Sequence, residues 1–246
     1  MSRGKYEPLH PPARPLTARV PKINLKHWAV MAAVVVGSNL TTHYFFNNHS
    51  AEAYAGMNVL SASFYKESGT NFYLADRASQ YIYDLRGFYQ KVQEVSQRLG
   101  VKEEWLLAVM DQESQFNPSV ANFKGSGATG LIQFMPGTAA ELGTTTYQLA
   151  SMDPIRQMDY VYQYLATVRE RYGDYKGLTD LYLAILYPKA RGADMCFTLF
   201  AKPSRSYKQN SGLDEDKDGR VTVSDIDHHL RRKYPDAFLA NGERGV

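Results

Sequence analysis

The sequence of 246 residues predicts a mainly α-helical protein. Apolar residues between positions 92 and 168 recur at intervals of three and four, and glycine or proline ends each of these runs. No alternating strand pattern precedes the glycine-rich segment at 125–130. The length allows one full domain with attachments or two small domains. The composition, 44% hydrophobic and 22% charged, excludes wholesale disorder.

The amino-terminal residues 1–27 form a basic, proline-rich arm. They hold six basic residues and one acidic residue, a net charge of +5, although the whole chain carries only +3. Five prolines in this stretch predict an extended conformation. The rest of the chain is therefore slightly acidic, and the overall charge is too small to indicate nucleic acid as the main partner.

Residues 28–46 form an apolar segment without a formal charge. About 20 such residues can cross a bilayer, so the segment predicts a helix that anchors the chain in a membrane, with the basic arm on the cytoplasmic side. Ser38, Asn39 and the polar run at 41–43 leave open a buried or interfacial helix instead. A cleaved signal peptide is a third interpretation, because residues 51–53 have the Ala-x-Ala form.

Residues 47–90 are an aromatic-rich connector in a polar background. Tyr81, Leu85, Phe88 and Tyr89 have helical spacing, so the end of this stretch is predicted to be helical. The residues suggest no chemistry of their own.

Two helices are predicted next, and the second contains a carboxylate in its apolar stripe. Val92, Val95 and Leu99 mark one face of the first helix, which Gly100 ends. The second helix is predicted over residues 102–115. Its stripe consists of Leu106, Val109, Met110 and then, at the next helical position, Glu113.

Glu113 is therefore expected to face the core near the end of its helix. Burial disfavours the ionised carboxylate and raises its pKa, and a carboxyl that stays protonated near neutral pH suits a general acid. Asp111 lies on a different side of the same helix, so it is not the expected catalytic partner. The alternative is a glutamate that reaches solvent or caps backbone amides at the helix end.

The segment at 125–130 has the spacing Gly-x-Gly-x-x-Gly. Because a helix and an Asn-Pro turn precede it, and no strand does, the dinucleotide-binding interpretation is rejected. The glycines instead indicate a tight backbone that lies against a flat surface. Apolar residues follow at 131–135 with Gln133 as the polar exception, and Pro136 opens a short helix that Gly143 ends.

These motifs resemble a known family. Glu113-Ser114, Asn117-Pro118 and the run Gly127-Ala-Thr-Gly130-Leu131-Ile132-Gln133-Phe-Met-Pro136-x-Thr138-Ala139 are similar to the soluble lytic transglycosylases. These are lysozyme-like enzymes that cleave bacterial peptidoglycan. The resemblance implies a lysozyme-like transglycosylase domain at 91–200, with Glu113 as the single catalytic acid and base and no cofactor for catalysis. It also implies substrate-binding residues: Ser114, Gly130, Leu131, Ile132 and Gln133.

The third motif of this family, Ala-Tyr-Asn, is altered in the chain. The matching segment is Ile185-Leu186-Tyr187-Pro188, in which proline replaces the asparagine and supplies no side-chain hydrogen bond. Tyr187 is expected to be catalytic, through a hydrogen bond to the Glu113 carboxyl. The alternative is a core tyrosine on a helix that Pro188 ends.

The resemblance further implies cleavage between N-acetylmuramic acid and N-acetylglucosamine, with a 1,6-anhydro product. A hydrolytic muramidase of the same fold and a non-catalytic, glycan-binding virion protein remain alternatives. The basic arm and the apolar segment suit a bacteriophage virion protein that opens the wall during infection, and nearly as well a bacterial membrane-anchored enzyme. Either way, the catalytic domain would act in the periplasm or cell wall.

Between the motifs, Asp153-Pro154 predicts a helix start with an aspartate N-cap. Its apolar stripe extends to Gly173 and is expected to be core: Ile155, Met158, Val161 or Tyr162, Leu165 and Val168.

Residues 214–225 match the calcium-binding loop of an EF-hand, with Gly219 at the position of the sharp turn. The expected metal ligands are Asp214, Asp216, Asp218, the Arg220 carbonyl, Thr222 and Asp225. Aspartate replaces the usual glutamate at the last ligand position, which predicts weaker calcium binding. The calcium would be structural, and a short helix would follow to residue 234. The alternative is an acidic turn held by Lys217 and Arg220, and residues 201–246 as a whole are the loop and tail.

The remaining reactive residues indicate no further chemistry. Cys196 is the single cysteine, which excludes an internal disulfide, and it is expected to be a packed thiol. The six histidines lack the His-Glu-x-x-His spacing of metalloproteases. His228 and His229 are expected on a solvated helix face.

Overall fold

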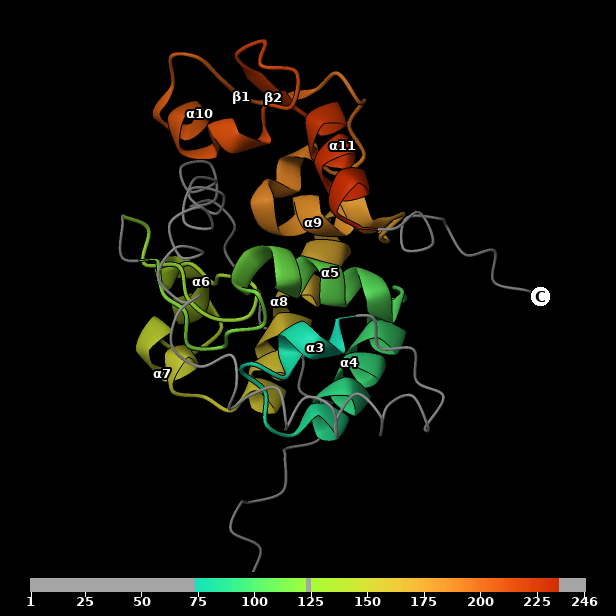
Figure 1. The fold of residues 1–246 in the computed structure, drawn as a ribbon, viewed down its shortest axis with the longest axis vertical. Helices are drawn as coiled ribbons and strands as arrows, with labels where there is room; N and C mark the ends of the chain where they lie inside the picture. Colours follow the sequence, from blue (N-terminus) through green and yellow to red (C-terminus); the bar gives the residue numbers. More distant parts are fainter. Residues whose placement is uncertain (1–73, 123–124, 235–246) are drawn as a thin grey trace, which may run out of the picture.

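The computed structural model describes residues 74–122 and 125–234 of the chain. This part is mainly helical, as predicted (Figure 1). The α-helices are α3 (Ala75–Ala78), α4 (Leu85–Leu99), α5 (Glu103–Ser114), α6 (Pro136–Glu141), α7 (Thr146–Ala150), α8 (Pro154–Tyr172), α9 (Leu178–Leu186), α10 (Arg205–Asn210) and α11 (Val223–Lys233). Two strands, β1 (Thr198–Ala201) and β2 (Arg220–Thr222), and two 3₁₀ turns, Pro188–Ala190 and Ser211–Leu213, complete it.

The ends of α4 and α8 follow the capping residues in the sequence. Helix α4 ends at Gly100, whose φ of 70° is in the left-handed region that glycine adopts without strain. At the start of α8, the Asp153 carboxylate accepts hydrogen bonds from the amides of Ile155 and Arg156, and Pro154 occupies the first turn. Both predicted ends are confirmed.

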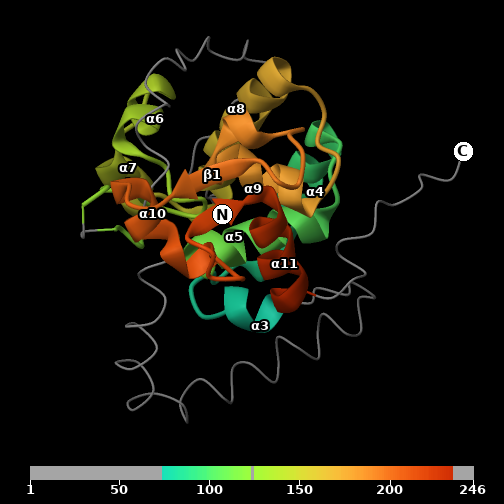
Figure 2. The same ribbon diagram turned by 90° about the horizontal axis from the view of Figure 1, so that it is seen from above.

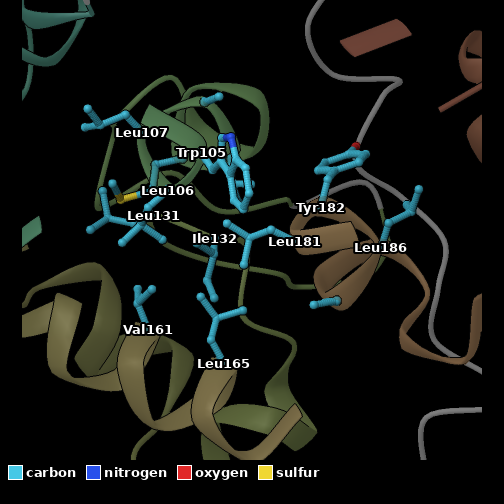
Figure 3. Packing of buried hydrophobic residues seen from close by; sticks show 14 of the residues in the cluster. Trp105, Leu106, Leu107, Leu131, Ile132, Val161, Leu165, Leu181, Tyr182 and Leu186 are labelled. Atoms are coloured by element: carbon cyan, nitrogen blue, oxygen red, sulfur yellow. The ribbon is translucent and has the colours of Figure 1, made fainter. Parts of the chain in front are cut away.

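The core lies among α4, α5, α8 and α9. Helix α4 packs against α8 and α5, and α5 packs against α9. In the described part of the chain, every side chain from Trp105 to Ser114 is buried, so α5 is a central helix rather than an amphipathic surface helix. Figure 3 shows where the elements meet, through Leu106 of α5, Leu131 and Ile132 of the loop that follows it, Val161 and Leu165 of α8, and Leu181 of α9.

The acidic-loop end of the molecule is built on a short antiparallel sheet. Strand β2 lies within the loop and pairs with β1, with Phe200 opposite Val221. Helix α11 leaves the loop and packs on α9 (Figure 2). Strand β1 therefore joins the segment before the acidic loop to the loop itself. The predicted boundary between residues 200 and 201 falls within β1, and that between 90 and 91 falls within α4.

Asp111 joins two distant segments, α3 and the end of α11, to α5. Its carboxylate is fully buried and accepts hydrogen bonds from Arg77 near the end of α3 and from the Tyr234 hydroxyl, both at 2.7 Å. Lys233 at the end of α11 lies 3.3 Å from the same carboxylate. Buried charges are tolerated when they are paired in this way. Asp111 therefore faces away from Glu113, as the helical wheel predicted, and serves the fold.

Two predictions about single residues were wrong. Cys196 is exposed rather than packed, because it lies in the turn before β1. His228 is exposed as expected, but His229 is half-buried and faces α5, where it contacts Gln112. Within residues 74–122 and 125–234, no helix has the length and apolar composition that a membrane crossing requires. The apolar segment 28–46 lies outside these residues.

Candidate active site

Glu113 lies in the last turn of α5 and is enclosed by the core. Its side chain is 6% exposed, and both carboxyl oxygens are buried without a hydrogen-bond partner among the described residues. Burial raises the pKa of Glu113 to about 8, and the positive charge of Lys233 acts in the opposite direction. The carboxyl is therefore largely protonated at neutral pH.

This geometry favours a general acid over a helix cap. A glutamate that reached solvent or capped backbone amides would keep a low pKa, and Glu113 does neither. A buried polar group without a partner is costly, so its presence in a native core indicates a function for the group. The protonated carboxyl has a hydrogen to donate and no acceptor in the described protein, which suits transfer of that proton to a substrate oxygen.

Ser114 holds the neighbouring loop rather than facing an open cleft. Its hydroxyl lies 2.9 Å from the carbonyl oxygen of Leu131 and 3.1 Å from that of Met110. Because these two acceptors occupy the donor, Ser114 connects the helix that carries Glu113 to the loop. The expected contact of Ser114 with substrate stays a prediction.

The loop at 125–134 folds back on itself. Thr129 and Phe134 exchange two backbone hydrogen bonds, and the Gly130 amide donates to the Val120 carbonyl. Gly130 has a φ of 88°, which favours glycine. The Gln133 side-chain amide donates to the carbonyl oxygens of Val120 and Gly130, at 3.3 and 3.1 Å. The tight backbone that the glycines predicted is confirmed.

Leu131 and Ile132, which were expected to bind substrate, have their side chains in the core, at 0% and 2% exposed. Any contact that they make with a glycan must therefore come from the backbone. Both polar groups of the Leu131 residue are already bonded within the protein. Its carbonyl accepts from Ser114, and its amide donates to the Gln157 side chain at 2.5 Å.

Gln157 is a structural residue of the site that the sequence interpretation missed. It is fully buried on α8, and its amide nitrogen donates to the carbonyl oxygens of Pro118 and Leu149, at 3.0 and 2.9 Å. A Cβ atom at Gly130 would lie 2.5 Å from the Gln157 oxygen, so this glycine allows the close approach. The sequence feature that could have indicated this role is a polar glutamine directly before Met158, which lies on the predicted apolar face of α8.

Replacing Gln157 with leucine should shift the loop. The Leu131 amide and the Pro118 and Leu149 carbonyls would lose their partner, at a cost of about 1–3 kcal/mol for each buried group left unbonded. We expect a lower free energy of unfolding by chemical denaturation and a lower kcat/KM on peptidoglycan. Gln163→Leu, on the half-buried face of the same helix, is the control. Equal effects of both variants would contradict this role for Gln157.

Tyr187 does not make the hydrogen bond expected of it. Among the described residues, neither Glu113 oxygen has a partner. Tyr187 follows the last residue of α9, and its ring packs edge-on against Phe200, with centroids 5.8 Å apart. Pro188 begins a 3₁₀ turn at this point and so ends α9. This contact fits the alternative interpretation, a core tyrosine on a helix that Pro188 ends, better than a hydrogen bond to Glu113.

Tyr182, on α9, is affected by the charge of Glu113. Burial first, and then the Glu113 charge, raise the pKa of Tyr182 well above its usual value, whereas the nearby Gln112 side chain lowers it. The Tyr182 hydroxyl is buried, and no residue in the described part of the chain forms a hydrogen bond of ordinary geometry with it. The spacing of Leu178, Leu181 and Tyr182 could have indicated this buried face.

We expect Tyr182→Phe to lower kcat about tenfold, equivalent to about 1.4 kcal/mol. The protein should remain at least as stable, because a buried hydroxyl without a hydrogen bond is removed. Tyr187→Phe should leave kcat within about twofold, since the ring contact with Phe200 survives. Turnover of purified peptidoglycan, together with thermal unfolding, measures both. A larger loss of kcat in Tyr187→Phe would restore the role expected from the sequence.

The acidic loop brings three aspartates together. Carboxylate oxygens of Asp214, Asp216 and Asp218 all lie within 4.8 Å of one another. Asp214 is 6% exposed, and its Oδ2 accepts hydrogen bonds from the Tyr207 hydroxyl and the Gly219 amide. Its Oδ1 is buried without a hydrogen-bond partner among the described residues. An enclosed carboxylate oxygen of this kind is available to a cation, so the cluster could hold an ion.

Two of the last expected ligands, Thr222 and Asp225, are bonded to each other by their side chains. Asp225 and Thr222 form a capping box at the start of α11, in which the Asp225 carboxylate accepts from the Thr222 amide at 2.8 Å. The Arg220 guanidinium pairs with Asp218 at 2.8 Å. Asp225 is not one of the three grouped aspartates, and its carboxylate is bonded at the start of its own helix.

A buried glutamate with a raised pKa, at the end of a central helix, is the arrangement that the sequence predicted for a lysozyme-like, glycan-cleaving domain. Residues 90–187 match the family model described as Transglycosylase SLT domain. This segment is thus a transglycosylase SLT domain, a lytic transglycosylase that acts on peptidoglycan. Glu113 and the loop at 125–134 lie inside the match, and the acidic loop lies outside it.

Proposed function

We propose that the domain cleaves the bond between N-acetylmuramic acid and N-acetylglucosamine and leaves a 1,6-anhydro end on the muramic acid. The observation that carries this proposal is the buried carboxyl of Glu113 with its pKa of about 8. Burial of this carboxyl raises its pKa, and the positive charge of Lys233 acts in the opposite direction. The family resemblance supplies the single acid and base, and a reaction without a catalytic water needs one carboxyl group rather than the pair that hydrolytic glycosidases use.

Glu113 takes both proton-transfer steps of this reaction. The protonated carboxyl first donates its proton to the glycosidic oxygen, and the bond from this oxygen to C1 of the muramic acid breaks. The resulting carboxylate then accepts the proton of the C6 hydroxyl as O6 attacks C1. The ring closes, the carboxyl is protonated again, and no water is consumed. We propose that Tyr182, whose pKa the charge of Glu113 raises, stabilises the carboxylate during the reaction by donating a hydrogen bond.

The products test the proposal directly. Purified sacculi are digested with the full chain and the muropeptides are analysed by mass spectrometry. Anhydro-muramic ends, which are one water lighter than reducing ends, are the expected result. Reducing muramic ends would instead show a hydrolytic muramidase of the same fold. Binding of sacculi without release of fragments would indicate a glycan-binding structural protein.

We also propose that the chain is a phage virion protein that opens the wall during infection. Support comes from the sequence of the basic arm at 1–27 and the apolar segment at 28–46, which lie outside the described residues. The full-length chain should be found by mass spectrometry in purified particles. Its recovery from the membrane of uninfected cells would favour a bacterial membrane-anchored enzyme.

The acidic loop is proposed to bind calcium as a structural ion. Asp214, Asp216 and Asp218 would hold it, and the unbonded Asp214 Oδ1 supports the assignment. Oxygen donors of this kind suit hard cations. Of the further ligands expected from the sequence, Thr222 and Asp225 would join only if the capping box rearranged, and the Arg220 carbonyl stays a predicted ligand.

Calcium should raise the thermal unfolding temperature of the full chain, because a ligand that binds only the folded state stabilises it. At a free concentration 100 times the Kd, the gain is about 2.7 kcal/mol. Asp214→Asn should abolish the shift, and Asp194→Asn, an exposed aspartate outside the cluster, should keep it. Differential scanning calorimetry with calcium or chelator measures this. A shift that persists in Asp214→Asn would place the ion elsewhere.

A further inference from the structure

Gln112, the residue before Glu113, is held at both ends of its amide by α11. The side chain is 2% exposed. Lys233 donates to its oxygen at 2.8 Å, and its nitrogen lies 3.2 Å from His229 Nε2. Because the ammonium of Lys233 can only donate, it fixes which end of the amide is oxygen. The amide nitrogen must then donate to His229 Nε2.

This direction also determines the protonation of His229. Since Nε2 accepts from Gln112, the ring proton lies on Nδ1 and is donated to the Glu215 carboxylate, 3.1 Å away. His229 is therefore neutral in this arrangement, which agrees with a pKa lowered mainly by burial. One ordered chain of hydrogen bonds connects Gln112, His229 and Glu215.

Glu215 belongs to the acidic loop, between Asp214 and Asp216. Its carboxylate is also held by the Arg232 guanidinium, with Nη2 at 2.8 Å from Oε1. Its backbone amide donates to Asp225 Oδ1 at 3.1 Å. A change in loop conformation therefore moves a carboxylate that is bonded directly to His229. The two motifs that were separate in the sequence are connected in the fold.

We infer that His229 is a positioning residue for the reaction, which links the conformation of the acidic loop through Gln112 to the catalytic end of α5. This inference rests on the proposed function of Glu113 and on cation binding at the loop. When the three aspartates hold a cation, the loop is fixed, Glu215 holds His229, and His229 holds Gln112. The backbone that carries Glu113 is then held in one position. Turnover therefore depends on the cation although the cation does not touch the substrate.

A merely structural contact would have a different consequence. Loss of His229 would then lower stability and lower kcat equally with and without the cation. A positioning role predicts a loss of coupling, because the cation still binds but no longer affects the catalytic helix. Coupling between sites is typically 5- to 150-fold, so we expect calcium to raise kcat about fivefold or more in the unaltered protein.

The test compares His229→Phe with His228→Phe in the full chain. Phenylalanine keeps a ring but has no ring nitrogen, and the exposed His228 is a matched control on the same helix. Three quantities are measured with calcium or with chelator: kcat on peptidoglycan, the unfolding temperature, and amide hydrogen exchange at the end of α5. In His229→Phe, calcium should still raise the unfolding temperature, but kcat and exchange should no longer respond. His228→Phe should respond fully.

A second variant, Gln112→Met, removes the amide that bonds to His229 and so breaks the same hydrogen bond. It keeps the test decisive if His229→Phe fails to fold. The inference would be overturned if kcat and amide exchange still responded fully to calcium in both variants. It would also be overturned if calcium bound the unaltered protein without changing kcat or amide exchange at the end of α5. Failure of calcium to bind would also overturn it. If calcium changes exchange at α5 through His229 but no condition gives turnover, the proposed reaction fails and the positioning link stands.

Discussion

Glu113→Gln should lower the turnover of peptidoglycan by about 10²- to 10⁴-fold, the usual contribution of general acid–base catalysis. Glutamine keeps the shape of the side chain but has no acidic proton to donate to the glycosidic oxygen and cannot accept the C6 hydroxyl proton. Release of soluble fragments from purified sacculi measures the loss. Glu104→Gln, at an exposed position of the same helix, should retain full activity.

The same variant should be more stable than the unaltered protein, in a manner that depends on pH. The folded pKa of Glu113, about 8, is raised above the ordinary value of 4.5, so folding favours the protonated form. Stability of the unaltered protein is therefore lost as pH rises from about 4.5 to 8, by up to about 1.4 kcal/mol per pH unit. Glutamine does not ionise, so its side chain adds no such pH dependence to the free energy of unfolding.

Denaturant unfolding at several pH values tests this expectation. The free energy of unfolding of Glu113→Gln, relative to that of the unaltered protein, should increase between pH 5 and pH 8 and change little above that. A difference that does not vary with pH would mean that Glu113 has an ordinary pKa in the folded protein. Unchanged wall clearing by this variant would exclude Glu113 as the acid.

Asp111→Ala should destabilise the protein by about 3–5 kcal/mol, because breaking a buried ion pair leaves its partners uncompensated. Lys233 and the Tyr234 hydroxyl would lose an acceptor, and the contact of α11 with α5 would be weakened. Equilibrium unfolding in urea measures the change. The exposed Asp76 of α3 offers the control, and Asp76→Ala should stay within about 0.5 kcal/mol.

Removing the Arg77 side chain separates the contributions within this network. Arg77 is 53% exposed at its side chain, so Arg77→Met should cost much less than Asp111→Ala. A loss in Asp111→Ala no larger than that in Arg77→Met would show that the buried carboxylate does not join α3 and α11 to the catalytic helix.

Helix positions, helix ends and the burial of Glu113 could be predicted from the sequence, because they depend on local properties. Apolar spacing determines which face of α5 or α8 turns inward, and Gly100 and Asp153 set helix ends through their own backbone and side-chain preferences. The turn at Gly219 follows from the same kind of rule, with a φ of 91°.

The contacts that connect the site could not be predicted in this way. Gln157, Tyr182 and His229 each occupy an ordinary helical position, and their roles depend on groups 26 to 117 residues away or on the charge of Glu113. The family motif indicated Tyr187, whereas Tyr182 has no place in that motif and is enclosed by the packing of α9.

The sequence by itself thus determined a helical domain with a buried acid at the end of one helix and an acidic loop near the carboxyl end. Only the tertiary structure decided that Tyr187 packs against Phe200, which glutamine holds the loop that follows the acid, and that α11 connects the acidic loop to Gln112. The physical reason is the separation along the chain over which each effect acts. Periodicity and capping act within a few residues, whereas a buried hydrogen bond depends on which distant surfaces the fold brings together.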